Sequence, residues 1–386
     1  MVKEMKRLTF LAVMAITCMP LLHAVPLRLK QLANQKDDAW FATADAIAVA
    51  DSVVKYQFPS GGWAKNVDWH LPAEGKSLKA RQEVWQQIHS ESGVGSTIDN
   101  GATTTELTLL ARVCRALNAK GKLSKDERRR LKTYGDTFQR GLDYLLTAQD
   151  PNGGWPQYYP FKPLNKEGHP FYSNHITFND NAMANVMRLL RNVSESNKPF
   201  DGLQLTDNKY KVRAHEAFMR GIQCILDCQI KKDGKLTVWC QQHDEQTLEP
   251  APARAYELPS FTGSHETPAL LELLMSLPEP SDSVVHAVSA AVEWLQAHAL
   301  RDMKVEAFTN ADGKRDRRLV HHFGSTTWAR YYDLQTEEPY VCDRDGVPQP
   351  SLEYIGYERR NGYGWYGNEP QRIIDRFPKW LEKIRK

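Results

Sequence analysis

The stretch Ala148-Gln149-Asp150-Pro151-Asn152-Gly153-Gly154-Trp155 recurs in related form elsewhere in the chain. Residues 56–63 also combine Gln with Gly-Gly-Trp, and a shorter version places Gln229 before Asp233-Gly234 and Trp239. Each version follows a segment whose apolar residues recur with a helical period. A turn repeated at the same point of successive helical units is typical of stacked helix hairpins. The sequence therefore predicts a mostly helical protein in which the hairpins form a toroid.

Apolar residues recur every 3.6 positions in three pairs of segments, which predicts three helix hairpins. These pairs are 103–119 with 125–148, 181–194 with 208–228, and 268–277 with 283–298. A further helix is expected over 39–57, followed by a long polar loop over 64–95 with a short helix near 78–88. Residues 300–386 are richer in Tyr, Arg and Gly and less periodic, which favours an irregular cap with short strands and a terminal helix near 370–386.

Residues 1–24 have the pattern of a secretory signal peptide: basic residues, an apolar run at 8–19, and a small residue, Ala24, for cleavage. The apolar run is too short to span a membrane. Cys18 fits a lipid-attachment site poorly because threonine precedes it. We therefore expect a secreted or periplasmic protein whose mature part, 25–386, is one domain with a helical toroid to about residue 300 and a cap beyond it.

The formal net charge is +3, and it becomes +1 when the three basic residues and one acidic residue of 1–24 are removed. This balance gives no reason to expect nucleic acid or a membrane surface as a partner, and we expect a monomer. Five cysteines remain, an odd number without zinc or disulfide-framework spacing. Cys224 and Cys228 lie four apart on a predicted helix and are interpreted as small apolar residues, with an isolated disulfide as the alternative.

The glycine-tryptophan turns have two interpretations. Glycine supplies the positive φ that a tight turn needs, and the indoles of Trp63 and Trp155 could fill the core between hairpins. Alternatively, these indoles could line a groove for sugars, because the apolar face of a sugar stacks on an aromatic ring. Trp155 is therefore a candidate substrate-binding residue.

Acidic residues precede the first helix of successive hairpins, where Asp99, with Asn100 beside it, and Asp180 stand. Such residues are most often N-caps. Thr103 and Glu106 already form a capping-box pattern for the first of these helices, which leaves Asp99 free. A toroid would bring these acids together, and oxygen-rich clusters suit Ca²⁺, so Asp99 and Asp180 are candidate metal ligands. Because a helix N-terminus opposes a cation, anionic groups of a substrate would have to complete the site.

Three arginines stand in loops among aromatic residues and prolines: Arg254, Arg330 and Arg344. A guanidinium binds a carboxylate through two parallel hydrogen bonds, so these residues are candidates for binding an acidic substrate. The ordinary alternative for each is a surface charge or a salt bridge, for example between Arg254 and Glu257.

The chain lacks the motifs of serine hydrolases, phosphate-binding loops, zinc proteases and dinucleotide-binding domains. Carboxylate pairs for glycoside hydrolysis are available, because any two of Asp99, Asp180 and Glu266 could serve. An inverting glycoside hydrolase acting on a uronic-acid polysaccharide is therefore one possible function, and a non-catalytic module that binds such a polysaccharide is another.

Several motifs together resemble one family, the pectate lyases of polysaccharide lyase family 10. The most specific are ARAYELPS at 253–260 and TFNDNAM at 177–183. The others, in the order of the family, are Gly61-Gly62-Trp63 with Lys65-Asn66, Thr97-Ile98-Asp99-Asn100 with Ala102-Thr103, DPNGGWPQYY at 150–159, WARYYDL at 328–334 and CDRDGV at 342–347. The resemblance covers nearly the whole mature chain.

The resemblance implies an (α/α)₃ toroid-like fold and Ca²⁺-dependent β-elimination on polygalacturonate or pectin. Arg254 matches the family's catalytic base. Asp99 and Asp180 match its calcium-associated acids, with Asn100 beside them as a substrate contact. Arg330 and Arg344 match arginines that bind substrate carboxylates, and Lys65 matches a further substrate contact.

The chemistry of 4-linked uronic acids agrees with this set of residues. The C5 proton is α to the carboxylate, so its removal builds negative charge that Ca²⁺ and arginine stabilise. Arginine is an unusual base because its ordinary pKa is about 12.5 or higher. We therefore expect an alkaline activity optimum, and we expect Arg254 to lie near other cations that lower its pKa.

Overall fold

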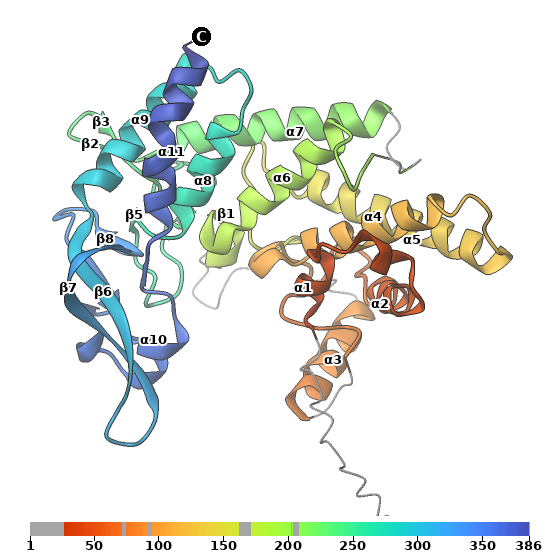
Figure 1. Ribbon diagram of the computed structural model, residues 1–386, viewed down its shortest axis with the longest axis horizontal. Coiled ribbons are helices and arrows are strands. Elements are labelled where there is room, and N and C mark those ends of the chain that lie inside the picture. The colour runs from red at the N-terminus through yellow and green to blue at the C-terminus, as the bar shows by residue number, and fades with distance from the viewer. Residues whose placement is uncertain are drawn as a thin grey trace, which may run out of the picture.

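The computed structural model of the chain describes residues 27–71, 75–90, 95–161, 171–201, 203 and 208–385, so the predicted signal peptide and Cys18 lie outside the described part. Three helix pairs form its centre: α4 (Thr104–Asn118) with α5 (Lys125–Thr147), α6 (Ala182–Ser194) with α7 (Asn208–Asp227), and α8 (Glu266–Met275) with α9 (Asp282–Ala297). Within each pair the helices are in contact, and so are successive helices of the row α4, α6, α8 and of the row α5, α7, α9 (Figure 1). The predicted fold of stacked helix hairpins is confirmed. The described helices form an arc and do not close into a barrel.

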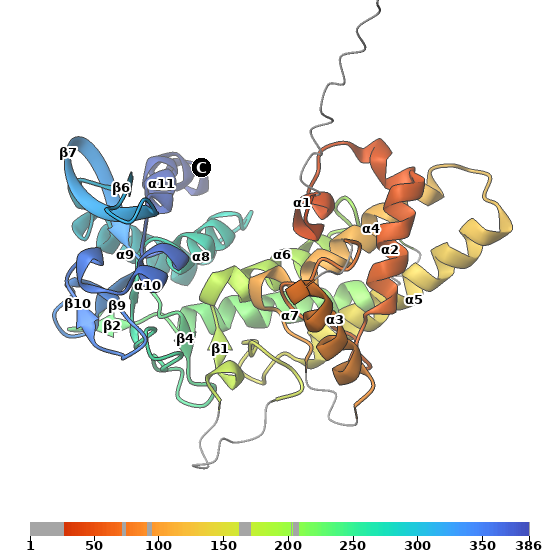
Figure 2. The same ribbon diagram turned by 90° about the horizontal axis from the view of Figure 1, so that it is seen from below.

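The N-terminal part covers one end of this arc (Figure 2). It contains α1 (Leu29–Ala33), the 3₁₀ helix η1 (Asp38–Ala42), α2 (Ala44–Lys55) and α3 (Gly75–Ile88). The α2 helix packs on α4 and α5 and is shorter than the predicted helix 39–57. The reason is Thr43, whose side chain accepts a hydrogen bond from the backbone N–H of Ala46 and so caps α2.

Each repeated turn is tied to the following helix pair by its glutamine. The amide Nε2 donates to a carbonyl within the turn and to a carbonyl of a helix in the next pair, at 2.7 to 2.9 Å. These bonds run from Gln57 to Gly61 and Thr137, from Gln149 to Gly153 and Ala217, and from Gln229 to Thr237 and Ala287. Gly153 has φ +92°, and a side chain there would collide with the carbonyl of Arg220, so the turn requires glycine.

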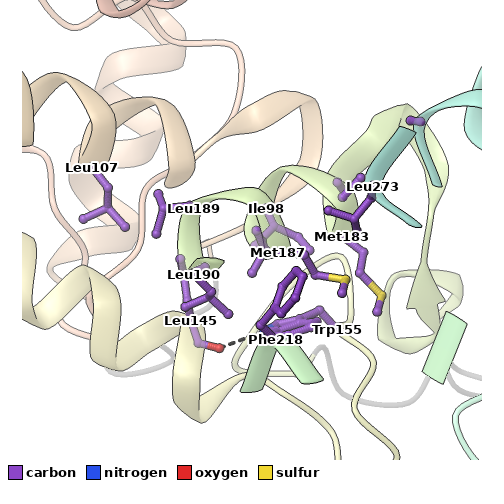
Figure 3. Close-up of a cluster of buried hydrophobic side chains, with 14 of the residues drawn as sticks. Ile98, Leu107, Leu145, Trp155, Met183, Met187, Leu189, Leu190, Phe218 and Leu273 are labelled. Atoms are coloured by element: carbon purple, nitrogen blue, oxygen red, sulfur yellow. Dashed lines mark hydrogen bonds between the residues drawn. The ribbon is translucent and has the colours of Figure 1, made fainter. Parts of the chain in front are cut away.

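The tryptophan that follows each turn belongs to the core. Trp63, Trp155 and Trp239 are completely buried, and each Nε1 donates to a carbonyl of the helix that precedes the turn, α2, α5 or α7. Figure 3 shows Trp155 beside Phe218 and Met187, with its bond to Leu145. The prediction that Trp155 binds substrate is therefore wrong, because an indole with 0% exposure has no free face for a sugar.

The substitution Trp155→Phe separates these two roles. It removes the 2.8 Å bond to the Leu145 carbonyl and leaves a small void, so we expect the free energy of unfolding to fall by about 2–3 kcal/mol. The KM for polygalacturonate should not change. Urea denaturation and steady-state kinetics measure the two quantities, and a raised KM at unchanged stability would restore the sugar-stacking interpretation.

The C-terminal cap consists of two small sheets and two helices. All of their elements follow α9 except the strand β5, which precedes α8. One sheet has the order β10-β9-β8-β5 and the other β11-β7-β6. The elements are β5 (Ser260–Thr262), β6 (Leu300–Thr309), β7 (Arg315–Ala329), β8 (Tyr331–Asp333), β9 (Pro339–Cys342), β10 (Pro348–Gln349), η5 (Leu352–Tyr354), α10 (Tyr357–Gly362), β11 (Tyr366–Gly367) and α11 (Glu369–Ile384). The predicted cap and terminal helix are confirmed. The β6–β7 hairpin is longer than the short strands expected and extends away from the helix pairs (Figure 1).

The remaining short elements lie in loops between helices: η2 (Asp99–Gly101), η3 (Tyr172–Asn174), β1 (Ile176–Thr177), η4 (Asn179–Asn181), β2 (Lys231–Lys232), β3 (Lys235–Leu236) and β4 (Gln242–His243). The cysteines described are all free and buried, and the sulfurs of Cys224 and Cys228 lie 3.9 Å apart, in agreement with their interpretation as small apolar residues. Within the described ranges, no helix combines the length and apolar character that crossing a membrane requires.

Candidate active site

The acids predicted to converge do so at one end of the helix row. The turn η2 precedes α4, the turn η4 precedes α6, and η4 is in contact with both η2 and the α8 helix. Both turns hold non-glycine residues in the left-handed conformation, with φ of 54° at Asn100 and 51° at Asp180. Such backbone strain costs about 1–3 kcal/mol per residue and is found most often at functional sites.

The capping box predicted for α4 is absent. Thr103 has φ 63° and makes no capping hydrogen bond. Its hydroxyl instead donates to the Thr97 carbonyl at 2.9 Å and accepts from the Trp63 N–H at 3.1 Å. Glu106 is buried, accepts a hydrogen bond from Trp69 Nε1, and has a pKa raised to about 7 by burial. The left-handed backbone of Thr103 turns its hydroxyl away from the helix, so the prediction of a capping box is wrong.

Asp99 lies beside Lys65 in a nearly closed environment. Its carboxylate is on a residue only 2% exposed, and Oδ2 pairs with Lys65 Nζ. Burial acts to lower the pKa of Lys65, but the charge and hydrogen bond of Asp99 and the charges of two nearby tyrosines together outweigh it, so the pKa is raised. Neighbouring Asn100 donates from Nδ2 to Asn66 Oδ1 at 3.1 Å. The structure therefore brings the predicted residues Lys65, Asp99 and Asn100 together.

Arg330 links the starts of the second and third helix pairs. Its Nη2 donates to Asn179 Oδ1 at 2.7 Å and to Asp180 Oδ1 at 3.1 Å, and its Nε donates to Glu266 Oε1 at 3.1 Å. Arg330 is 3% exposed and Glu266 is 0% exposed. Burial acts to lower the pKa of Arg330, but the charges of Glu266, Asp180 and two neighbouring tyrosines together outweigh it, so the pKa is raised and the group stays cationic. No motif in the sequence indicates these protein partners, and contact of Arg330 with substrate stays a prediction.

Two tyrosines connect Arg330 to the loop that carries Arg254. The Arg330 guanidinium lies 4.7 Å from the centre of the Tyr363 ring. Tyr363 donates its hydroxyl proton to Glu257 Oε1 at 2.6 Å, and the Tyr331 hydroxyl donates to Tyr363 at 2.7 Å. Burial raises the pKa of Tyr363 well above its ordinary value, so this hydroxyl remains a donor.

Arg254 and Glu257 occupy the two ends of one tight turn. The Glu257 N–H donates to the Arg254 carbonyl at 2.7 Å. Arg254 donates from Nε to Glu257 Oε2 at 2.7 Å and from Nη2 to Glu257 Oε1. Burial acts to lower the pKa of Arg254, but the hydrogen bonds and charge of Glu257 outweigh it and the pKa is raised. The expectation that cations lower this pKa is therefore wrong, and the salt bridge considered as an alternative is present.

Arg344 lies on the exposed side of the same loop region. Its side chain is 62% exposed and donates from Nε and Nη2 to Glu358, both at 3.1 Å. The Tyr256 ring lies 5.7 Å from the Arg344 guanidinium and 5.1 Å from the Arg254 guanidinium. The guanidiniums of Arg254, Arg344 and Arg359 therefore gather around one aromatic ring, and contact of Arg344 with substrate stays a prediction.

The prediction from sequence missed three residues of this site. Glu257 was considered only as a surface salt-bridge partner, although its spacing from Arg254 was visible. Tyr363 had no sequence signal because it stands 106 residues after Glu257. Asn181, with φ 61°, follows Asp180 directly, and among the described residues its buried Oδ1 has no hydrogen-bond partner.

The residues at the two turns fit a calcium ion. Asp99 Oδ1, like Asn181 Oδ1, is buried and has no hydrogen-bond partner in the part of the chain that is described. Carboxylate and amide oxygens are the ligands that Ca²⁺ takes in proteins, and a buried oxygen without a partner is costly unless something binds it. Asp180 adds a second, partly exposed carboxylate.

A different cluster, His175 with Asp244 and Glu245, has one ligand atom from each residue within 4.8 Å of the others. Its imidazole Nδ1 is 2.7 Å from Glu245 Oε2. Nitrogen ligands suit transition metals and not Ca²⁺, so the oxygen-only set around Asp99 and Asp180 is the better fit to calcium.

Comparison with known proteins agrees with this site. The sequence model of the family described as pectic acid lyase matches residues 57–374. A family 10 polysaccharide lyase from Cellvibrio cellulosa is 31% identical in sequence, with a TM-score of 0.70 over 92% of this chain and 95% of that chain. A point mutant of a family 10 polysaccharide lyase from the same organism, in complex with trigalacturonic acid, has the same identity and TM-score over 91% of this chain and 95% of that one. No curated protein matches the chain significantly.

A helical arc whose end gathers carboxylates and arginines, together with these matches, defines the protein as a polysaccharide lyase. The family model covers most of the sequence, and the solved relatives cover almost all of it. The chain therefore belongs to the pectic acid lyase family, and the resemblance to family 10 seen in its motifs is confirmed.

Proposed function

We propose that this protein cleaves polygalacturonate by Ca²⁺-dependent β-elimination with Arg254 as the base. The observation that carries the proposal is one continuous set of contacts. Asp180 binds Arg330, Arg330 packs on Tyr363, and Tyr363 donates to Glu257, which in turn holds Arg254. These contacts connect Arg254, the proposed base, to the turn η4, which carries Asp180 at one end of the helix row.

The chemistry requires a base, a cationic environment for a carboxylate, and a leaving group. The base takes the C5 proton, the C5–H electron pair forms the C4–C5 double bond, and the C4–O bond breaks with its electrons on oxygen. Negative charge builds on the C6 carboxylate as the proton leaves, so cations fixed beside that carboxylate lower the barrier. Arg344, which shares the Tyr256 ring with Arg254, and Lys65, which pairs with Asp99, would hold uronate carboxylates.

Calcium is expected to bind at Asp99, Asp180 and Asn181. When bound, it would supply Lewis-acid stabilisation of a substrate carboxylate. The trigalacturonic acid in the complex of the Cellvibrio cellulosa lyase supports an oligogalacturonide as substrate. Export through the signal peptide predicted at 1–24 agrees with a polymeric substrate outside the cell.

Substitution of Asp99 tests the calcium site. Asp99→Asn removes the charge of a buried ligand, so the Ca²⁺ concentration for half-maximal activity should rise by at least about tenfold, since even outer-shell partners of metal sites change affinity by about 10–100-fold. Activity is measured against free Ca²⁺. Asp126→Asn, exposed on α5, is the control. An unchanged calcium requirement in Asp99→Asn would remove Asp99 from the site.

The inverting-hydrolase alternative is less well supported by the carboxylates. All three candidates pair with cations, since Asp99 pairs with Lys65 and both Asp180 and Glu266 pair with Arg330. Hydrolysis needs one carboxylic acid that keeps its proton, which a neighbouring cation opposes. The products decide the point, because elimination gives an oligosaccharide one water lighter than hydrolysis does.

A further inference from the structure

Glu257 is held more firmly than a surface salt bridge would require. Its residue is 1% exposed, and both carboxylate oxygens accept two hydrogen bonds. Oε1 accepts from Arg254 Nη2 and from the Tyr363 hydroxyl at 2.6 Å. Oε2 accepts from Arg254 Nε at 2.7 Å and from the Arg254 backbone N–H at 3.4 Å. The carboxylate therefore has a fixed position relative to Arg254.

The three nitrogens of the Arg254 guanidinium differ in their hydrogen-bond partners. Nε and Nη2 are both occupied by Glu257. Nη1 has no hydrogen-bond acceptor among the residues that the structure describes, and the side chain as a whole is 34% exposed. Glu257 thus leaves one nitrogen of the guanidinium free to meet a ligand.

We propose that Glu257 is the positioning residue of Arg254 and selects Nη1 as the nitrogen that takes the C5 proton. The inference rests on the proposed function. In a neutral arginine side chain one nitrogen is an imine with a lone pair. An imine at Nε would have no proton left for Glu257, and an imine at Nη2 would keep a single, weaker donor, so the two bonds to the charged carboxylate favour the lone pair on Nη1. In the transfer, Nη1 takes the proton from C5, the C5–H electrons form the C4–C5 double bond, the C4–O bond breaks with its electrons on oxygen, and the guanidinium is again paired with Glu257.

The same carboxylate acts against basicity. The titratable and charged groups around Arg254 are Glu257, Tyr256, Tyr363 and Arg359, with Arg344 at the same Tyr256 ring. Burial acts to lower the pKa of Arg254, and Glu257 raises it by more. Glu257 therefore affects the reaction in two opposite ways. It orients Nη1 correctly, which favours proton transfer, and it raises the pKa of Arg254, which moves activity to higher pH. Each effect can be measured separately.

The matched variants Glu257→Gln and Glu257→Asp separate these contributions. Gln has nearly the same shape as Glu but carries no charge and has only one acceptor oxygen. It therefore cannot accept both hydrogen bonds from the Arg254 guanidinium. We expect kcat to fall by about 100-fold, as for a misplaced reacting group, and the rising limb of the pH–rate profile to move to lower pH. Asp keeps the charge but is shorter, so kcat should fall while the limb moves less than in Gln.

If Glu257 had a merely structural role, kcat would fall in both variants while the rising limb of the pH–rate profile stayed at its wild-type position. That result would overturn the inference. If Glu257→Gln does not fold in thermal unfolding, Glu257→Asp decides, because wild-type kcat there contradicts the inference. The Arg254→Ala variant separates the two proposals. Wild-type kcat in Arg254→Ala refutes the proposed function, whereas an inactive Arg254→Ala with wild-type kcat and pH profile in Glu257→Gln refutes this inference alone.

Discussion

Replacing Arg254 by alanine is expected to lower kcat on polygalacturonate by about 10²–10⁴-fold, the range in which general-base catalysis contributes. Arg254 has no substitute in its loop, because the nearest charged groups are the buried Glu257 and the cation Arg359. Affinity for trigalacturonic acid should change by less than about tenfold, since Arg344 remains to bind carboxylates. Initial rates of unsaturated product and calorimetric binding measure the two effects.

Two further variants sharpen this prediction. Arg129→Ala, exposed on α5, is the matched control and should keep wild-type kcat. Arg254→Lys introduces a group with a lower ordinary pKa, about 10.4, which would favour activity if basicity alone mattered. Because an ammonium cannot form the two-bond grip on Glu257, we expect low activity in Arg254→Lys as well. Full activity in Arg254→Ala would show that another group removes the proton.

The substitution Glu266→Ala is expected to lower the free energy of unfolding by about 3–5 kcal/mol, as when one partner of a buried ion pair is removed. It leaves the guanidinium of Arg330, which is 3% exposed, with only the partly exposed Asp180 as a charge partner. Urea denaturation measures the change. Glu83→Ala, which breaks the exposed pair with Lys79, is the control and should cost less than about 1 kcal/mol.

A double substitution tests the reason for this loss. Replacing both partners by apolar residues of similar size, Glu266→Leu with Arg330→Met, removes the unpaired charge, so much of the stability should return. A single-variant loss below about 1 kcal/mol would show that the pair is hydrated in solution and does not join the helix starts as the structure indicates.

The helix pairs were predictable because their apolar periodicity is strong. The predicted segments 103–119 and 283–298 differ from α4 and α9 by only one residue at each end. The β6–β7 hairpin was not. Met303, Val305 and Ala307 alternate with Lys304 and Glu306, but this run is short, a bulge between Arg301 and Met303 interrupts the strand, and both strands are largely solvated. Local turns such as the Thr43 cap decided helix boundaries that periodicity leaves open.

The site was predictable where one motif holds the chemistry and unpredictable where distant segments meet. Asp99 and Asp180 converge as expected because each begins a helix of the same row. Trp155 was misassigned because a tryptophan after a glycine turn looks alike whether it faces a groove or the core. The raised pKa of Arg254 depends on the short distances and burial of Glu257, which sequence spacing alone does not determine.

The central claim is Ca²⁺-dependent elimination, and the absorbance of the unsaturated uronate formed from polygalacturonate at alkaline pH tests it most directly. We expect a steady rise with Ca²⁺ present, no rise with EDTA, and a rise with Ca²⁺ that is at least about 100-fold slower for Arg254→Ala. New reducing ends that appear without this absorbance would contradict it, because they would show that water cleaves the chain.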